Sequence, residues 1–115
     1  MHEMSLAGGV LRVVEDAAAR ERFTRVKRLT LEAGALAGVE VSSLRFALEA
    51  ITPGTVLDGA TIQIDEPPGQ AWCMRCGETV MIASRADACP HCGTWQLTPT
   101  GGTELKVREL IVHDD

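Results

Sequence analysis

The first twenty residues carry apolar side chains at helical spacing. One face collects them in a regular series: Leu6, Val10, Val13 or Val14, and Ala17. This period of three to four positions is typical of one buried face of a helix. Ser5 is of a type that caps helix N-termini. The pattern therefore predicts an amphipathic helix from Ser5 to about Arg20, and we expect its apolar face to pack into the core.

Residues 25–33 alternate instead. Leu29, Leu31 and Ala33 share one face with Lys27, and more polar positions occupy the other. Alternation with a period of two is typical of a half-buried strand. We expect a strand at 25–33, followed by a glycine-containing loop at 34–38.

A second helical stretch follows that loop. Its apolar face holds Val41, Leu44, Leu48 and Ile51. Ser42 or Ser43 is the expected N-cap, and Pro53-Gly54 is expected to end the helix. The chain therefore contains two predicted helices.

Two further stretches are strand-like, at 60–65 and at 104–112. Apolar residues fall on both faces of the closing segment, so we expect it to return to the main sheet. Breakers surround the region between them: Pro67-Pro68-Gly69 before it, and 98–102 after it.

The elements predict an α/β (α+β) fold, a small mixed sheet with two helices. One α/β domain is expected to comprise 1–68 and 101–115. A zinc-ribbon-like, four-cysteine module is expected as an insertion at 69–100.

The composition of the chain argues against some classes of function. The net charge is −5 and aromatic residues make up 3% of 115 residues, with no tyrosine. An acidic chain with few aromatics lacks the basic footprint of a nucleic-acid-binding protein. No segment is apolar for long enough to span a membrane, and the N-terminus lacks a secretory pattern. We therefore expect a cytoplasmic protein with no nucleic-acid or membrane partner, in which thiols stay reduced.

The cysteines form two C-x₂-C-G knuckles, one with Cys73 and Cys76, the other with Cys89 and Cys92. Tight turns of this spacing present backbone N–H groups to thiolates, and two facing turns make a tetrahedral sulfur site. Zinc is the leading occupant because four thiolates close its shell. Iron in a rubredoxin-like site competes, since tetrahedral sulfur suits both metals.

The surroundings of the cage are predicted as well. Residues 79–82 are expected to form a strand of a short hairpin within the spacer between the knuckles. Trp72 and Trp95 are expected to pack into a small core. His91 is interpreted as a solvent-facing or supporting residue rather than a ligand, and His113 as a residue without a functional role.

The chain start holds an unusual density of nitrogen donors. Met1-His2-Glu3 offers an α-amine, backbone amides and an imidazole within a few atoms. Imidazole and amide nitrogens suit nickel(II), and planar nitrogen coordination is typical of nickel or copper. Alone this signal is weak, because any protein can have histidine second.

These features together resemble the HypA/HybF family of hydrogenase nickel-insertion proteins. The shared positions run along the whole chain: Met1-His2-Glu3-Met4-Ser5, the two C-x₂-C knuckles, Gly34-Ala35-Leu36, Val39-Glu40, Ser42-Ser43-Leu44, Phe46, Gly54-Thr55, Gly59-Ala60-Thr61-Ile62 and the ending 104–110.

The resemblance implies a nickel metallochaperone for [NiFe]-hydrogenase maturation, with urease as a second recipient in some members. It implies that a HypB-type GTPase and the hydrogenase large subunit are partners. It also assigns nickel to Met1, His2 and Glu3, which makes 1–68 and 101–115 the nickel-binding domain. Structural zinc is assigned to the four cysteines, which makes 69–100 the zinc-binding domain. The break at Pro67-Pro68-Gly69 further permits a homodimer by exchange between protomers.

The chelate chemistry agrees with this assignment. The Met1 amine and His2 amide close a five-membered ring, and the His2 amide and imidazole close a six-membered one. These three nitrogens can share a plane, whereas a Glu3 amide cannot join them. The fourth donor is then an apical group, a Glu3 group, or a group from a partner or water.

Two other classes of function stay open from the residues alone. One is a zinc-ribbon protein-interaction module, and the other is a rubredoxin-like electron carrier. We expect no enzyme, because every cysteine belongs to the cage and no histidine accompanies a candidate nucleophile. We therefore predict no catalytic residues.

Overall fold

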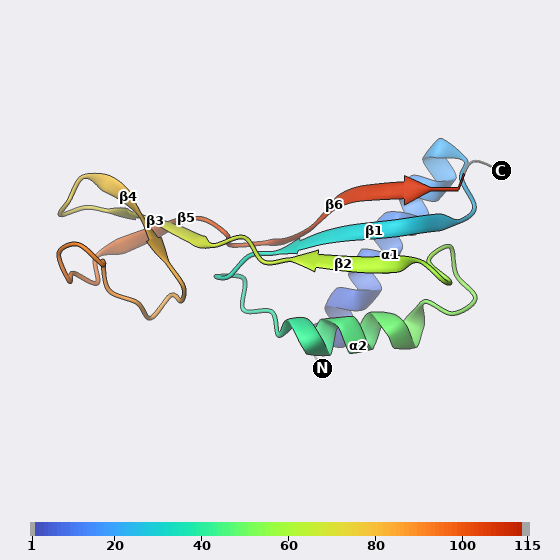
Figure 1. Ribbon diagram of the computed structural model, residues 1–115, viewed down its shortest axis with the longest axis horizontal. Coiled ribbons are helices and arrows are strands. Elements are labelled where there is room, and N and C mark those ends of the chain that lie inside the picture. Colours follow the sequence, from blue (N-terminus) through green and yellow to red (C-terminus); the bar gives the residue numbers. More distant parts are fainter. Residues whose placement is uncertain (1, 114–115) are drawn as a thin grey trace. The chain divides into compact units, whose positions relative to one another are not determined.

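Two helices and six strands make up the part of the chain that the computed structural model describes, residues 2–113. In chain order they are α1 (His2–Glu21), β1 (Val26–Ala33), α2 (Val41–Ile51), β2 (Thr61–Asp65), β3 (Gly69–Cys73), β4 (Glu78–Ile82), β5 (Leu97–Gly101) and β6 (Leu105–Val112) (Figure 1). They build two three-stranded sheets, ordered β2-β1-β6 and β4-β3-β5. Neither described helix is long and apolar enough to cross a membrane.

The described residues divide into two compact units. Unit 1 comprises the residues up to Leu31, then Glu40–Ile64, then those from Lys106 on. Unit 2 comprises Glu32–Val39 and Asp65–Leu105. The loop before α2 thus lies with the cysteine region. The functional division, nickel at 1–68 and 101–115 and zinc at 69–100, stays a prediction.

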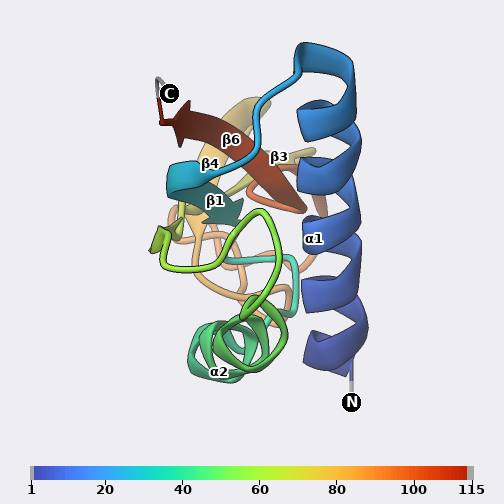
Figure 2. The same ribbon diagram turned by 90° about the vertical axis from the view of Figure 1, so that its right-hand side faces the viewer.

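Unit 1 contains the expected mixed sheet with two helices. The arrows of β2 and β6 point in opposite directions on the two sides of β1, so one neighbour is parallel to β1 and the other antiparallel (Figure 1). The closing segment has returned to the main sheet, as predicted. Both helices lie on the same side of this sheet (Figure 2). The core between them is aliphatic: Val10, Val14, Leu29, Leu31, Leu44 and Leu48 are buried.

Both helices begin differently from the prediction. The first, α1, starts at His2 rather than Ser5, with the acidic Glu3 in its first turn, where the positive end of the helix dipole favours a carboxylate. The N-cap of α2 is Glu40, not Ser42 or Ser43. Both serines instead lie within the helix.

The Glu40 carboxylate performs the capping. Its Oε1 accepts hydrogen bonds from the Ser43 N–H at 3.1 Å and from the Ser42 hydroxyl. These bonds, that of the Ser42 hydroxyl first, lower the pKa of Glu40. The glutamate therefore satisfies a backbone donor that the helix leaves unpaired.

Unit 2 is built on β3, the central strand. It pairs antiparallel with β4 from Gly69↔Ile82 to Cys73↔Glu78, and antiparallel with β5 on its other side. The prediction of a flexible breaker at 98–102 is wrong, because all but its last residue lie in the strand β5. Pro99 is tolerated since β5 is an edge strand, and a register shift follows next to it.

Three backbone segments meet closely in unit 2 at Gly34, Pro68-Gly69 and Gly102. A Cβ at Gly34 would lie 2.2 Å from the Gly102 carbonyl oxygen, and one at Gly102 would lie 2.4 Å from that of Pro68. Backbone bonds reinforce the crossing: the Leu36 N–H donates to Gly102 O at 2.8 Å. The Ala35 N–H donates to Pro67 O at 3.0 Å. The break expected at 67–69 is thus bonded to another chain segment.

This crossing predicts a strong effect of one methyl group. Gly34→Ala should destabilise the protein by about 1–3 kcal/mol, because the clash is with backbone that cannot rotate away. Gly9→Ala is the matched control: no atom lies within 4 Å of its Cβ position, and in an exposed helix it should stabilise by ~0.5–1 kcal/mol. Urea unfolding measures both. Equal stability of Gly34→Ala and the natural chain would contradict the close approach.

Candidate metal centres

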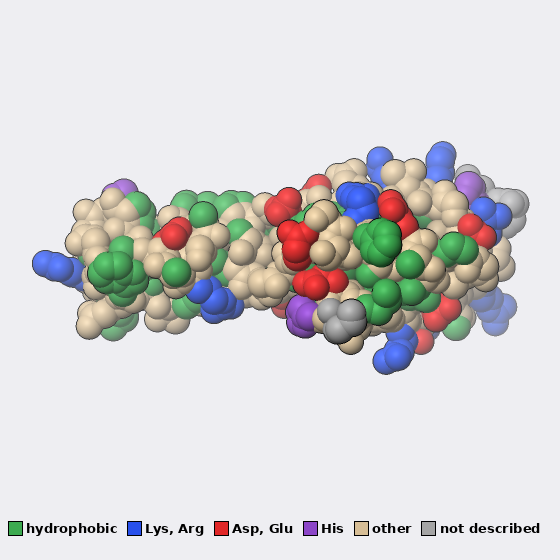
Figure 3. Space-filling model, turned by 90° about the horizontal axis from the view of Figure 1, so that it is seen from below, with side chains coloured by type: hydrophobic (Ala, Val, Ile, Leu, Met, Phe, Trp, Pro, Cys, Tyr) green, Lys and Arg blue, Asp and Glu red, His purple; other side chains and the backbone are tan. Residues whose placement is uncertain are grey.

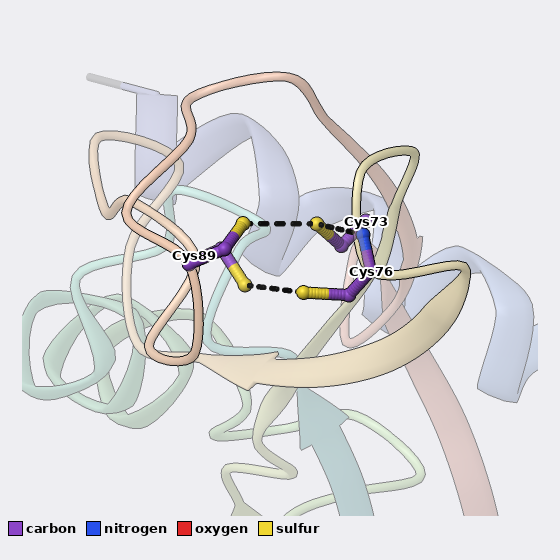
Figure 4. Close-up of side chains that lie close together, drawn as sticks. Cys73, Cys76 and Cys89 are labelled. Atoms are coloured by element: carbon purple, nitrogen blue, oxygen red, sulfur yellow. Dashed lines mark hydrogen bonds between the residues drawn. The ribbon is translucent and has the colours of Figure 1, made fainter.

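The four cysteines converge on one point. Their Sγ atoms all lie within 4.8 Å of one another. The Cys73–Cys92 sulfur pair is 3.7 Å apart and the Cys76–Cys89 pair 3.9 Å apart, and Figure 4 shows the side chains pointing toward one another. In residues 2–113 this is the one group of histidine, cysteine and carboxylate side chains close enough to hold a metal ion.

The first knuckle is the turn of the β3–β4 hairpin. Cys73 ends β3, and its sulfur accepts the Cys76 N–H at 3.3 Å. Gly77, with a φ of 66°, donates its N–H to the Cys73 carbonyl at 2.8 Å. The hairpin expected within the spacer is therefore displaced: 79–82 do form a strand, but its partner precedes the knuckle.

The second knuckle has a similar set of bonds and contains no strand, but its sulfur accepts from the residue two positions on rather than three. The Cys89 sulfur accepts the His91 N–H at 3.4 Å. Gly93, with a φ of 79°, donates to the Cys89 carbonyl at 2.9 Å. The His91 side chain itself is exposed. In both turns an N–H points at sulfur, which favours a thiolate over a thiol.

The cage fits zinc(II). Four ligands at about 2.3 Å in a tetrahedron lie roughly 3.8 Å from one another, and the two sulfur pairs match that separation. Burial opposes ionisation of Cys89, but the N–H groups of Cys92 and His91 lower its pKa to about 6. Hydrogen bonding to the Cys92 sulfur, followed by burial, raises the pKa of Cys76 to about 12. At neutral pH and without a cation, Cys76 therefore keeps its proton.

The core around the cage is small. It consists of Leu36, Ala71, Val80 and Ile82 together with the cysteines. The prediction that Trp72 and Trp95 fill this core is wrong, since they are 40% and 74% exposed. In β3 the alternation that turns Ala71 and Cys73 inward turns Trp72 outward.

The chain start lies in unit 1, and Met1 falls outside the described residues. His2 is the first residue of α1 and is exposed, whereas Glu3 is half-buried. Figure 3 shows acidic side chains gathered beside a histidine on one face of the molecule. The first N–H groups of a helix have no partner within it, so the His2 amide is not required by α1. The set Met1, His2 and Glu3 stays a prediction.

Glu40 is a residue of this region to which the sequence reasoning gave no role beyond the family resemblance. Its backbone N–H donates to the Glu3 Oε2 at 3.3 Å. The two residues are thirty-seven positions apart in the sequence, so no local pattern indicates the contact. The acidic residue directly before the second apolar helical face is the only signal that could have drawn attention to it.

Comparison with known proteins places this geometry in a family. The family model described as "Hydrogenase/urease nickel incorporation, metallochaperone, hypA" matches residues 1–112. The chain is 62% identical to the Hydrogenase maturation factor HypA of Polaromonas naphthalenivorans, over 100% of both chains. It is 60% identical to that of Cupriavidus necator, over 99% of this chain and 96% of the relative.

Solved structures share the fold. The solution structure of the Ni metallochaperone HypA from Helicobacter pylori superimposes with a TM-score of 0.70 at 18% identity, covering 96% of each chain. A second solution structure, of a HypA protein, has a TM-score of 0.71 at 19% identity and covers 100% of this chain and 98% of that one.

The four-cysteine cage predicts that removal of the metal disrupts the structure of unit 2 and leaves the helices of unit 1 intact. Both tryptophans of the chain lie in unit 2 and both described helices in unit 1. A strong chelator should therefore change the tryptophan fluorescence while the helical circular dichroism persists, because the small core around the cysteines cannot replace the metal bonds. Zinc re-addition is the control and should restore the fluorescence. Unchanged fluorescence in protein shown to be metal-free would contradict this role.

Proposed function

Because this chain belongs to the HypA family of hydrogenase/urease nickel-incorporation metallochaperones, we propose that it binds nickel(II) at Met1, His2 and Glu3 and delivers it for [NiFe]-hydrogenase maturation. Members of this family are metallochaperones and not enzymes. Nickel is therefore cargo here. A urease is a second recipient under this proposal, since the family description includes that enzyme.

The observation that carries the proposal is the exposure of His2 in the first turn of α1. The chelate rings contain only the Met1 amine, the His2 amide and the His2 imidazole as donors, so α1 can stay helical from His2 onward while nickel binds. The His2 amide has no helical partner to lose. A three-nitrogen site leaves a fourth position for a recipient's ligand, which suits a carrier.

The second metal has a different part in the proposal. Cys73, Cys76, Cys89 and Cys92 hold structural zinc, with all four thiolates used and no position open for exchange. The separation of the two sites in the sequence supports this division. A closed sulfur shell retains its ion, whereas the chain start exchanges nickel.

The proposed partners follow from the family. They are a HypB-type GTPase and the [NiFe]-hydrogenase large subunit, with a homodimer as a further assembly and the cytoplasm as the location. The relatives' name, hydrogenase maturation factor, supports the hydrogenase as recipient. Nickel content of the purified large subunit is the test: cells lacking this chain should produce it nickel-poor, and a normal content would sink the assignment.

Nickel titration tests the site directly. His2→Ala should weaken nickel binding sharply, because it removes the imidazole and opens the six-membered chelate ring. A chain extended before Met1 should also lose affinity, since its amine is then an amide. Calorimetry on the untagged protein and both variants, with zinc assayed in each, is the measurement.

His113→Ala is the matched control, since His113 is also exposed and near a chain end. It should leave nickel binding unchanged, and zinc should stay stoichiometric in all variants. If His2→Ala bound nickel as tightly as the natural chain, the N-terminal site would be wrong. Indifference to nickel with retained binding to a macromolecule would favour the zinc-ribbon interaction module instead.

A further inference from the structure

Glu3 differs from its neighbours at the start of α1. His2 and Met4 are exposed, but Glu3 is half-buried and its Oε2 accepts the Glu40 N–H at 3.3 Å. Glu40 directly precedes α2. The hydrogen bond therefore joins the first turn of α1 to the start of α2, two elements that pack against each other within unit 1.

Glu40 takes part in this junction with two separate groups. Its carboxylate accepts from Ser43 and Ser42 and caps α2. Its amide donates to Glu3. The positive end of the α2 dipole also lies here, and it favours a carboxylate close by. Both acidic side chains are thus held by hydrogen bonds rather than left free.

We propose that Glu3 is a positioning residue for nickel binding, whose carboxylate fastens the first turn of α1 to the Glu40 amide. This deepens the proposed function and rests on it, because it takes nickel to bind at His2. Since Oε2 already accepts a backbone N–H, Glu3 belongs to the nickel site through the placement of His2 and needs no direct bond to the metal.

The physical reason is the fraying of chain ends. Terminal turns of helices open unless another element ties them down. When only a fraction of molecules present His2 in the binding conformation, the apparent dissociation constant rises by the inverse of that fraction. A hydrogen bond that holds the turn closed therefore strengthens nickel binding without touching the metal.

Two substitutions at Glu3 separate positioning from ligation. Glu3→Ala removes the acceptor, and nickel affinity should fall roughly five- to tenfold. Glu3→Gln keeps an amide oxygen that accepts the Glu40 N–H but is a poor nickel donor. It should stay within about twofold of the natural chain. Glu15→Ala, which removes an exposed acid from the same helix, is the matched control and should change nothing.

A second measurement does not involve nickel. Hydrogen exchange of the Glu40 amide, followed by NMR in the nickel-free protein, should accelerate in Glu3→Ala and stay slow in Glu3→Gln. Equal loss of nickel affinity in both Glu3 variants, or exchange at Glu40 that ignores Glu3, would overturn the positioning role. Unaltered nickel binding in His2→Ala would overturn the nickel site itself, while the exchange result would still report on the junction.

Discussion

The convergence of four sulfur atoms is the constraint on which unit 2 depends. Its buried core holds only a few aliphatic side chains beside the cysteines, and both tryptophans point outward. The first knuckle is also the turn of the β3–β4 hairpin. The positions of its two sulfur ligands and the register of the two strands therefore depend on each other. Leu36, from the loop before α2, is buried in this same core. Metal binding and the folding of unit 2 are therefore coupled.

Much of the fold was predictable because it rests on local periodicity. The helical face of Val10 and Val14 and the alternation around Leu29 predicted α1 and β1. The errors arose where tertiary pairing overrides local preference. The stretch around Pro99 looks like a breaker, yet it forms β5 because an edge strand next to a register shift needs no donor there. The Glu40 cap was missed because serines are the commoner caps.

The candidate sites divide in the same way. The four cysteines were predicted to form one cluster, because the spacing within each knuckle brings two sulfurs to one tight turn. The structure confirms this, since all four sulfurs lie close together. The junction between Glu3 and Glu40 could not be predicted, because it depends on how α1 and α2 pack. The prediction for the tryptophans was wrong because a small core has room only for side chains of suitable volume on the inward face of a strand. Hydrophobicity alone indicates neither the volume nor the face.

The strand order has a consequence for synthesis on the ribosome. The chain passes between the two units four times, and β6, a neighbour of β1, follows all the other described elements. Every segment of unit 2, including the loop at 32–39, emerges before β6. Domains generally fold as units during synthesis. All four ligands of the thiolate cage are therefore synthesised before the strand that completes the sheet of unit 1.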